Sequence, residues 1–370
     1  MSKVSKVSKE LTEEVNIKEQ KTTKKKKLKN KQKKKSKIYP LTIICIIIDL
    51  LAIGGFVITY GPWDYLRNIY VTTAMKTKDH HYLANVFYSD AKIQEIMNKN
   101  YFIEFNENVN MDDIVIDTSE KDSYDNKYDE AILTREDGND LYKILNIKVG
   151  SSDAYIVAIY HPEKVKLISK EILGTKYGER VFTMCKRYGG VVCINGGGFV
   201  DYGYGSGIPM GYVIENSVIR WSDGDSKTIR GNIVGMTDEG KLMLMPNATG
   251  QEALEAGVTN AMEFGPFLIV NGKALEIYGD PWGKAPRVAI AQRKDGVLLF
   301  LVVDGRNYIN GASLQEMVDT LLKYGAYNAA NLDGGQSATL IVNDKLYNKP
   351  PAEARSTNGR YVITGWGLIP

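Results

Sequence analysis

Two aspartates follow apolar runs and directly precede glycine, a position where a carboxylate can meet a ligand. Asp333 stands in the heptapeptide NLDGGQS, and Asp304 follows the run VLLFLVV in the segment DGR. Paired carboxylates can supply a nucleophile or a base that activates water. A third acid, Glu263, precedes the apolar run FGPFLIV, and both an acid–base role and a hydrogen-bonded structural role fit it. These three acids are the candidate catalytic residues.

Glycines beside these motifs predict a close approach of the backbone to a ligand. Glycine allows positive φ, and successive amides in such turns can bind an anion. Neither glycine cluster matches a dinucleotide-binding or Walker A pattern, so we expect an anionic ligand that is not a nucleotide. Hydroxyl side chains nearby would donate hydrogen bonds to the same ligand. The candidate binding residues of these motifs are Asn195, Gly196, Gly197, Gly334, Gly335, Ser337 and Thr339.

Arginines close to the same motifs suit a phosphate, because the planar guanidinium can donate two hydrogen bonds to it. Arg287 stands in KAPRVAI and Arg306 in VDGR. Each could instead form a surface ion pair with one of the 44 acidic residues of the chain. Clustered carboxylates could also hold Mg²⁺ or Ca²⁺, and the sequence leaves this open. The histidines lack metal-ligand spacing with cysteine, so no zinc site is predicted.

The segment 297–342 has the pattern that must position the two aspartates. An apolar strand precedes Asp304, a capping box with a helical apolar stripe follows at 313–325, and a second strand precedes Asp333. This pattern predicts a β-α-β unit whose strands run parallel through a right-handed crossover. Both aspartates would then lie at one edge of a sheet, and Asn195 would join them if its strand runs parallel as well.

The rest of the chain from residue 145 onward alternates short apolar runs with turn residues. Several hairpins are indicated between 200 and 310, where helical pattern is sparse. The predicted fold class is therefore α+β, with mixed, largely antiparallel sheets and a β-α-β unit near the C-terminus. This fold is expected behind a single N-terminal transmembrane helix.

The N-terminal part of the chain differs in composition. Residues 1–37 contain 15 Lys and 4 Glu, while the rest of the chain has a net charge of −8. We expect this Lys-rich tail to be disordered and cytoplasmic. It would act as a topology signal or would contact anionic lipid headgroups. Nucleic acid is not expected as a partner, because no aromatic residue interleaves with the lysines.

Residues 38–60 form an apolar segment of the length that crosses a bilayer, about 20 helical residues. The lysines before it predict a single-pass anchor in the cell membrane, with the C-terminal body extracellular. Asp49 interrupts the segment, and either a partner helix or tolerance of one protonated Asp explains it. Residues 61–144 are interpreted as a membrane-proximal helical stalk and acidic linker, and residues 145–370 as the functional domain.

Three cysteines give little indication of a disulfide framework. Cys45 falls in the apolar segment, while Cys185 and Cys193 fall on a predicted helix and a predicted strand. A bridge between the latter two is left open, but the sequence does not predict a fold that depends on disulfides.

Taken in order, several motifs resemble one known family. The segments INGGGF, GPFLIVNGK, PRVAIAQ, LFLVVDGR, SLQEMVDTLLKYGA and NLDGGQSATL are similar to the phosphodiester glycosidase family, and the resemblance covers residues 145–370. Two departures stand out. Three glycines follow Asn195, where the family commonly has N-G-G-F-F or N-A-G-F-F, and Gln336 replaces the third glycine of D-G-G-G-S. The glutamine adds a side chain beside the glycine turn, which would narrow substrate choice or weaken activity.

The resemblance implies hydrolysis of the bond between a sugar anomeric carbon and a phosphodiester oxygen. It implies that Asp333 and Asp304 supply the carboxylate function and that arginines neutralise the phosphate. Asn195 and the glycine amides would hold sugar or phosphate oxygens. The residues expected on the phosphate side are Arg287, Arg306, Arg355 and Asn358.

The expected protein is therefore a membrane-anchored extracellular enzyme that hydrolyses sugar-1-phosphodiesters, such as GlcNAc-1-phosphate diesters, in envelope or exopolysaccharide glycans. Its partners would be a phosphate-containing glycan and, through residues 38–60, the membrane. The sequence does not give the oligomeric state. Two alternatives keep the fold without turnover, namely a carbohydrate- or envelope-binding protein and a membrane scaffold.

Overall fold

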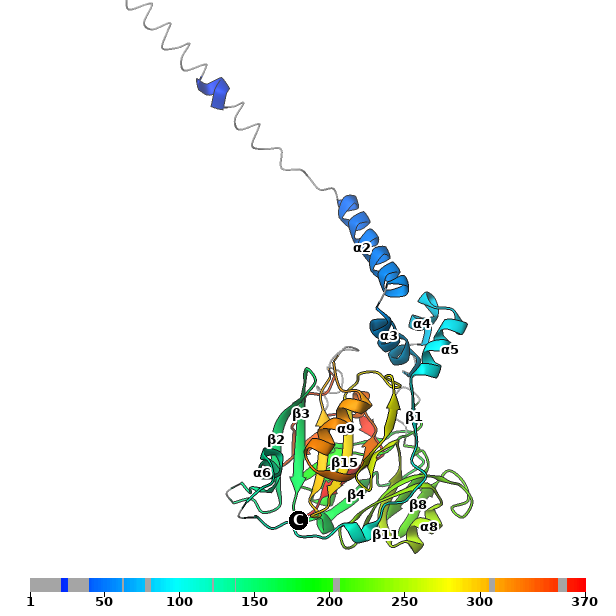
Figure 1. Ribbon diagram of the computed structural model, residues 1–370, viewed down its shortest axis with the longest axis vertical. Coiled ribbons are helices and arrows are strands. Elements are labelled where there is room, and N and C mark those ends of the chain that lie inside the picture. Colours follow the sequence, from blue (N-terminus) through cyan, green and yellow to red (C-terminus); the bar gives the residue numbers. More distant parts are fainter. Residues whose placement is uncertain are drawn as a thin grey trace, which may run out of the picture. The chain divides into compact units, whose positions relative to one another are not determined.

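The computed structural model divides into two compact units, Met1–Trp63 and Asp64–Pro370, which are drawn in Figure 1. The residues that the structure describes are 21–25, 40–61, 63–76, 81–121, 123–136, 138–201, 207–305, 310–351 and 358–370. Of the predicted Lys-rich tail only residues 21–25 are described, and these are helical and exposed.

The helix α2 (Pro40–Tyr60) forms where the sequence predicted a membrane anchor. Within the part of the chain that the structure describes, none of the helices combines the length and the apolar character needed to cross a bilayer. The predicted transmembrane helix at 38–60 and the single-pass membrane localisation that depends on it are therefore wrong. Asp49 lies near the middle of α2, and an acidic side chain at the centre of a membrane-spanning helix would oppose its insertion by about 2.5–3.5 kcal/mol.

The second unit begins with short helices that share a small core of their own. Val71, Ala84 and Ile93 are buried in it, one from each of the first three helices. A further helix forms within the segment interpreted as an acidic linker. These helices are α3 (Asp64–Lys76), α4 (His81–Phe87), α5 (Asp90–Lys99) and α6 (Lys127–Leu133).

A seven-stranded sheet forms the centre of the second unit, and each pair of neighbouring strands in it runs antiparallel. Its central strands are buried along their whole length, which fits their unbroken apolar sequences. In order across the sheet, the strands are β13 (Lys273–Ala274), β12 (Phe267–Val270), β17 (Ala326–Leu332), β15 (Arg287–Arg293), β16 (Leu298–Val303), β3 (Ser152–Ile159) and β2 (Tyr142–Val149).

The predicted β-α-β unit is present in this sheet as β16, α9 (Leu314–Lys323) and β17. Both strands pair antiparallel with β15, which lies between them, so they run parallel to each other. The predicted capping box of Ser313 and Glu316 starts the helix. Its apolar stripe packs on one face of the sheet, in a core that also contains side chains of β12, β15 and β17, and α9 is labelled in Figure 1. The ends of β16 and β17 therefore share one edge, as the sequence predicted.

The opposite face of this sheet shares a core with two five-stranded antiparallel sheets. One consists of β19 (Lys345–Leu346), β18 (Leu340–Val342), β6 (Val192–Asn195), β21 (Thr364–Leu368) and β4 (Val165–Ser169). The other consists of β10 (Leu242–Ala248), β9 (Gly231–Thr237), β11 (Val258–Glu263), β7 (Tyr212–Glu215) and β8 (Val218–Ser222). The strand that ends at Asn195 therefore lies in a different sheet from the two aspartate strands.

Smaller elements complete the unit. Two-stranded sheets pair β1 (Tyr101–Ile103) with β14 (Glu276–Tyr278) and β5 (Glu179–Arg180) with β20 (Tyr361–Val362). Two more helices are α7 (Val181–Tyr188) and α8 (Gly250–Glu255). The 3₁₀ turns are η1 (Met111–Asp113), η2 (Pro162–Lys164) and η3 (Gly335–Ser337).

A disulfide joins Cys185 on α7 to Cys193 on β6, which the sequence had left open. Both cysteines are fully buried in a core between the helix and the sheet. The bridge ties α7 to the strand that leads directly to Asn195. Gly189 ends α7 in a left-handed conformation, and the chain turns there so that Cys185 and Cys193 meet.

Replacing Cys185 and Cys193 together by alanine should lower the free energy of unfolding by about 2–3 kcal/mol, because the closed loop restricts the unfolded chain. Urea unfolding without reductant measures the loss. The matched control is Cys45→Ala, since Cys45 is a free, exposed cysteine. Equal stability of the double variant and this control would contradict a structural role for the bridge.

Candidate functional site

Asn195 joins two parts of the candidate site. It ends β6, is fully buried, and contacts the chain that follows β17. Its Nδ2 donates to the carbonyl oxygen of Asp333 at 2.6 Å, and its Oδ1 accepts from the amide of Thr339 at 3.0 Å. The amide of Asp333 also donates to the carbonyl of Gly196 at 2.9 Å. Asn195 therefore positions the Asp333 turn, and its side chain is already bonded to protein.

Asp333 has the electrostatic environment of a reactive carboxylate. Burial raises the pKa of Asp333 to about 6, and the charge of Asp201 acts in the same direction. The Ser337 hydroxyl, the charge of Arg360 and the Gly334 amide lower this pKa. Asp333 is therefore ionised at neutral pH and binds a proton just below it, as a general base requires.

Arg360, which the sequence motifs did not single out, brings a positive charge near Asp333. Its Nη2 donates to Oδ2 of Asp201 at 2.7 Å, and its guanidinium lies 5.2 Å from the ring centroid of Phe199. The Arg360 and Asp201 side chains are 24% and 27% exposed, so solvent reaches the pair. Arg360 stands two residues after Asn358, which the sequence did place on the phosphate side. No spacing rule connects the segment of Arg360 to those of Asp201 and Asp333, so the sequence did not identify Arg360 itself.

Asp304 lies at the predicted sheet edge, but both of its carboxylate oxygens are bonded to protein. Its Oδ2 accepts from the Tyr155 hydroxyl at 3.0 Å, and its Oδ1 accepts from Nδ2 of Asn348 at 3.1 Å. The amide of Lys349 donates to both oxygens, at 2.9 and 3.0 Å. Burial and then the Asp304 charge raise the pKa of Tyr155, which keeps the phenol a donor. Asp304 therefore fixes the chain that follows β19.

Arg287 is likewise committed to the protein backbone. Its Nε donates to the carbonyl of Ala312 at 3.0 Å, and its Nη2 donates to those of Trp282 and Gly283 at 3.2 and 2.8 Å. Burial lowers the pKa of Arg287 to about 10, and the charge of Asp280 acts in the opposite direction. These bonds hold together the segments that precede β15 and α9.

Glu263 turns its side chain away from the Asn195 motif. The neighbouring Met262 faces that motif, because a Cβ added to Gly196 would lie 2.8 Å from its Sδ. The Glu263 carboxyl lies instead between Gly211 and Gly231, where an added Cβ on either glycine would lie 2.1 Å from Oε2. Burial raises the pKa of Glu263. The described part of the chain contains no group of three or more His, Cys, Asp or Glu side chains placed to hold a metal ion.

The glycine amides that were expected to bind an anion have acceptors within the protein. Gly196 donates to the carbonyl of Thr364 at 2.9 Å, and Gly197 donates to Oγ1 of the same residue at 3.0 Å. Gly335 donates to the carbonyl of Pro286 at 2.8 Å. These amide hydrogens serve to join neighbouring segments and are not free for a ligand.

Glycine is needed at two positions of the Asp333 turn for different reasons. At Gly334 an added Cβ would lie 2.6 Å from the carbonyl oxygen of Pro286, so the two backbones approach too closely for a side chain. Gly335 has open space around it but a φ of 58°, which favours glycine. Gln336 is exposed and is not among the positive-φ residues, so the backbone does not require a third glycine there.

The other predicted binding residues take different positions. The Ser337 hydroxyl is buried and makes no hydrogen bond of good geometry, yet it is close enough to Asp333 to lower the pKa of that carboxyl. Thr339 is buried and its Oγ1 donates to the carbonyl of Ser337 at 2.9 Å. Asn358 is exposed and has a φ of 58°. The predicted residues that lie outside the described part of the chain are Arg306 and Arg355.

Known proteins resemble the part of the chain that carries these residues. A family model described as phosphodiester glycosidase matches residues 188–369. Residues 188–369 belong to the phosphodiester glycosidase family. The family predicted from the motifs is thus confirmed, and the match spans Asn195, Asp333 and Arg360.

Two relatives show how far the similarity reaches. The SPbeta prophage-derived uncharacterized protein YomE of Bacillus subtilis (strain 168) is 32% identical over 183 residues, which are 47% of this chain and 28% of that protein. The N-acetylglucosamine-1-phosphodiester alpha-N-acetylglucosaminidase of Bos taurus is 44% identical over 64 residues, which are 17% of this chain and 12% of that protein. The chain thus spans less than a third of either relative.

The fold is also that of a solved member of the family. The catalytic domain of zebrafish N-acetylglucosamine-1-phosphodiester alpha-N-acetylglucosaminidase, auto-inhibited by its pro-peptide, superimposes with a TM-score of 0.52 and 20% identity. The superposition covers 64% of this chain and 85% of that chain. The phosphodiester glycosidase domain therefore shares its α+β architecture with that enzyme.

Replacing Asn195 by alanine should lower the free energy of unfolding by about 2–3 kcal/mol, because it leaves the Asp333 carbonyl and the Thr339 amide unpaired in the interior. Urea unfolding measures the loss. Gln315→Ala removes a similar amide from the exposed face of α9 and should change stability by less than about 0.5 kcal/mol. Equal losses in the two variants would contradict the role of Asn195.

Proposed function

We infer that the phosphodiester glycosidase domain hydrolyses sugar-1-phosphodiester linkages, such as those of GlcNAc-1-phosphate diesters, in envelope or exopolysaccharide glycans. The observation that carries this proposal is the Asp333 turn, in which a carboxyl with a pKa of about 6 lies within the electrostatic reach of Arg360. The match to the family and the activity that the name of the bovine relative states support the same reaction type.

In the proposed reaction Asp333 acts as the base. Its carboxylate removes a proton from a water molecule, whose oxygen forms a bond to the anomeric carbon of the sugar. The bond between that carbon and the phosphate oxygen breaks, and its electron pair leaves with the phosphate. Because phosphate is a good leaving group, the chief requirement is stabilisation of the oxocarbenium-like centre and of the departing charge.

Arg360 supplies the positive charge for the departing phosphate in this proposal. It is partly exposed and is held by a carboxylate, Asp201, rather than enclosed by backbone carbonyls as Arg287 is. A phosphate can replace the Asp201 carboxylate in part as the acceptor of the Arg360 hydrogen bonds, because a guanidinium binds both anions through the same N–H donors. The phosphate role that the sequence gave to Arg287 therefore passes to Arg360.

A second candidate function is glycan binding without turnover. The observation that favours it is that two of the three predicted acids are engaged elsewhere, since Asp304 is bonded on both oxygens and the Glu263 carboxyl lies between Gly211 and Gly231. A reaction on this site would have to proceed with Asp333 as its carboxylate. Hydrolysis of a simple diester distinguishes the two functions.

For the wild-type protein acting on a GlcNAc-1-phosphodiester, kcat/KM should fall below about pH 6 and be constant above it. The reason is that the base acts in its ionised form, which is lost as the pH falls through the Asp333 pKa of about 6. Asp333→Asn should reduce kcat/KM by about 100-fold or more and abolish this pH dependence.

The control for this prediction is Asp319→Asn, which removes an exposed carboxylate from α9 and should keep the wild-type profile. Wild-type activity in Asp333→Asn would reject Asp333 as the base. Absence of hydrolysis in the wild type, with binding of the diester retained, would favour the glycan-binding function.

A further inference from the structure

A surface segment, residues 170–180, runs beside the candidate site and is called the rim here. The amide of Gly174 donates to the carbonyl of Gly207 at 2.8 Å, and the amide of Gly207 donates to the carbonyl of Thr175 at 2.9 Å. At its end the rim forms β5, where Arg180 pairs with Tyr361 of β20. Tyr361 directly follows Arg360 in the chain, so its pairing with Arg180 brings the end of the rim next to the proposed phosphate-binding residue.

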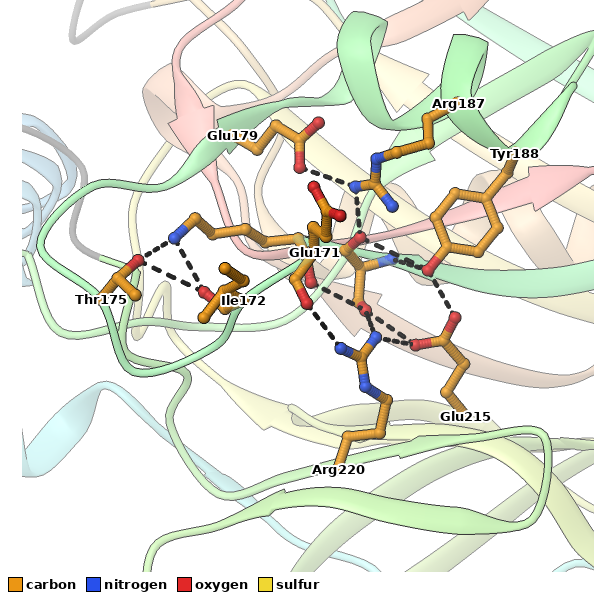
Figure 2. A network of polar contacts seen from close by, with 10 residues as sticks. Glu171, Ile172, Thr175, Glu179, Arg187, Tyr188, Glu215 and Arg220 are labelled. Carbon is orange, nitrogen blue, oxygen red and sulfur yellow. Dashed lines mark hydrogen bonds and ion pairs between the residues drawn. The ribbon is translucent and has the colours of Figure 1, made fainter.

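A network of polar contacts holds the rim in place, and Figure 2 shows it. At one end the Lys170 ammonium donates to the carbonyl of Ile172 at 2.8 Å and to the Thr175 hydroxyl. At the other end Nη2 of Arg187 donates to Oε2 of Glu179 at 2.7 Å. The same nitrogen donates to the carbonyl of Ser169 at 2.8 Å, so one arginine links the end of β4 to the start of β5.

A buried carboxylate, that of Glu215, lies at the centre of this network. Glu215 is 8% exposed, and its oxygens accept from the Ser169 hydroxyl at 2.8 Å, from Nη1 of Arg220 at 2.5 Å and from the Tyr188 hydroxyl. Nη2 of Arg220 donates in turn to the carbonyl of Glu171 at 2.7 Å. Residues from two sheets and α7 thus fix the rim, and a ligand that binds there meets a surface that is already ordered.

Two exposed tyrosines line the rim, and each has a cation near its ring. Tyr361 is 38% exposed, and the Arg180 guanidinium lies 4.4 Å from its ring centroid. Tyr177 is 52% exposed, and the Lys176 ammonium lies 5.2 Å from its ring centroid. Nε of Arg180 is buried and has no hydrogen-bond partner among the residues that the structure describes. Each of the two exposed rings thus has a cation beside it, and the rim as a whole contains three basic and two acidic residues.

This combination suits a ligand in which sugars and phosphates alternate. The C–H bonds of a pyranose ring pack on the negative face of an aromatic ring, and a phosphate pairs with a nearby cation. We propose that Tyr361 with Arg180 and Tyr177 with Lys176 bind the sugar-phosphate units next to the one at Asp333, so that the substrate is a phosphodiester-linked glycan chain rather than a small diester. This proposal rests on the proposed function and adds the residues that bind the units of the glycan next to the one that is cleaved.

The test compares two substrates, a methyl diester of GlcNAc-1-phosphate and an oligomer of GlcNAc-1-phosphate joined by phosphodiesters. Tyr361→Ala should reduce kcat/KM on the oligomer by about tenfold, mainly through KM, and leave the methyl diester unchanged. Combining it with Tyr177→Ala should enlarge the loss on the oligomer. Tyr278→Ala is the matched control, since that tyrosine is 44% exposed on β14 and should affect neither substrate.

Equal losses on both substrates, or no loss on the oligomer, would overturn the proposal. If wild type hydrolyses neither substrate, the proposed function fails. The equilibrium affinities of wild type and Tyr361→Ala for the oligomer then test separately whether the rim binds sugar-phosphate units. A roughly tenfold weaker affinity of the variant would support the rim, and equal affinities would overturn it. Thermal unfolding checks that the variants are folded, and Arg180→Gln replaces Tyr361→Ala if that variant is not.

Discussion

The site depends on the two hydrogen bonds that the side chain of Asn195 makes. This side chain reaches from the end of one sheet to the chain that leaves another, where it bonds the carbonyl of Asp333 and the amide of Thr339. Both groups are interior, so without it each would have to find another partner or remain unpaired. The disulfide to α7 fixes the strand that carries Asn195, and the turn that presents the Asp333 carboxyl is therefore fixed from both sides.

Most of the motif residues hold the segments around Asp333 together by hydrogen bonds within the protein, and these bonds occupy the groups that were expected to contact a ligand. Asp304 is bonded to the Tyr155 hydroxyl, the Asn348 side chain and a backbone amide, and Arg287 is bonded to backbone carbonyls. The amides of Gly196 and Gly197 are bonded to Thr364. Burying charged and polar groups in this way is tolerable because nearly every one is paired. What remains for chemistry is a small set, in which the solvent-accessible Arg360 lies close enough to influence the pKa of Asp333.

Local sequence patterns predicted the β16–α9–β17 unit, because a capping box, a helical stripe and unbroken apolar strands are properties of neighbouring residues. They also placed Asp304 and Asp333 at one edge. Patterns could not predict that Asp304 would be bonded to Asn348, or that Arg360 would lie near Asp333, because those contacts join segments far apart in the chain. The predicted membrane anchor rested on an apolar run and the lysines before it, and it is wrong.

In the proposed reaction water attacks the sugar carbon and not the phosphorus. Hydrolysis of a GlcNAc-1-phosphodiester in water labelled with heavy oxygen tests it directly, with mass spectrometry of both products. The label should enter the sugar hydroxyl, and the released phosphate monoester should carry none. Label found in the phosphate would mean that the phosphorus–oxygen bond breaks, and it would contradict a glycosidase mechanism at Asp333.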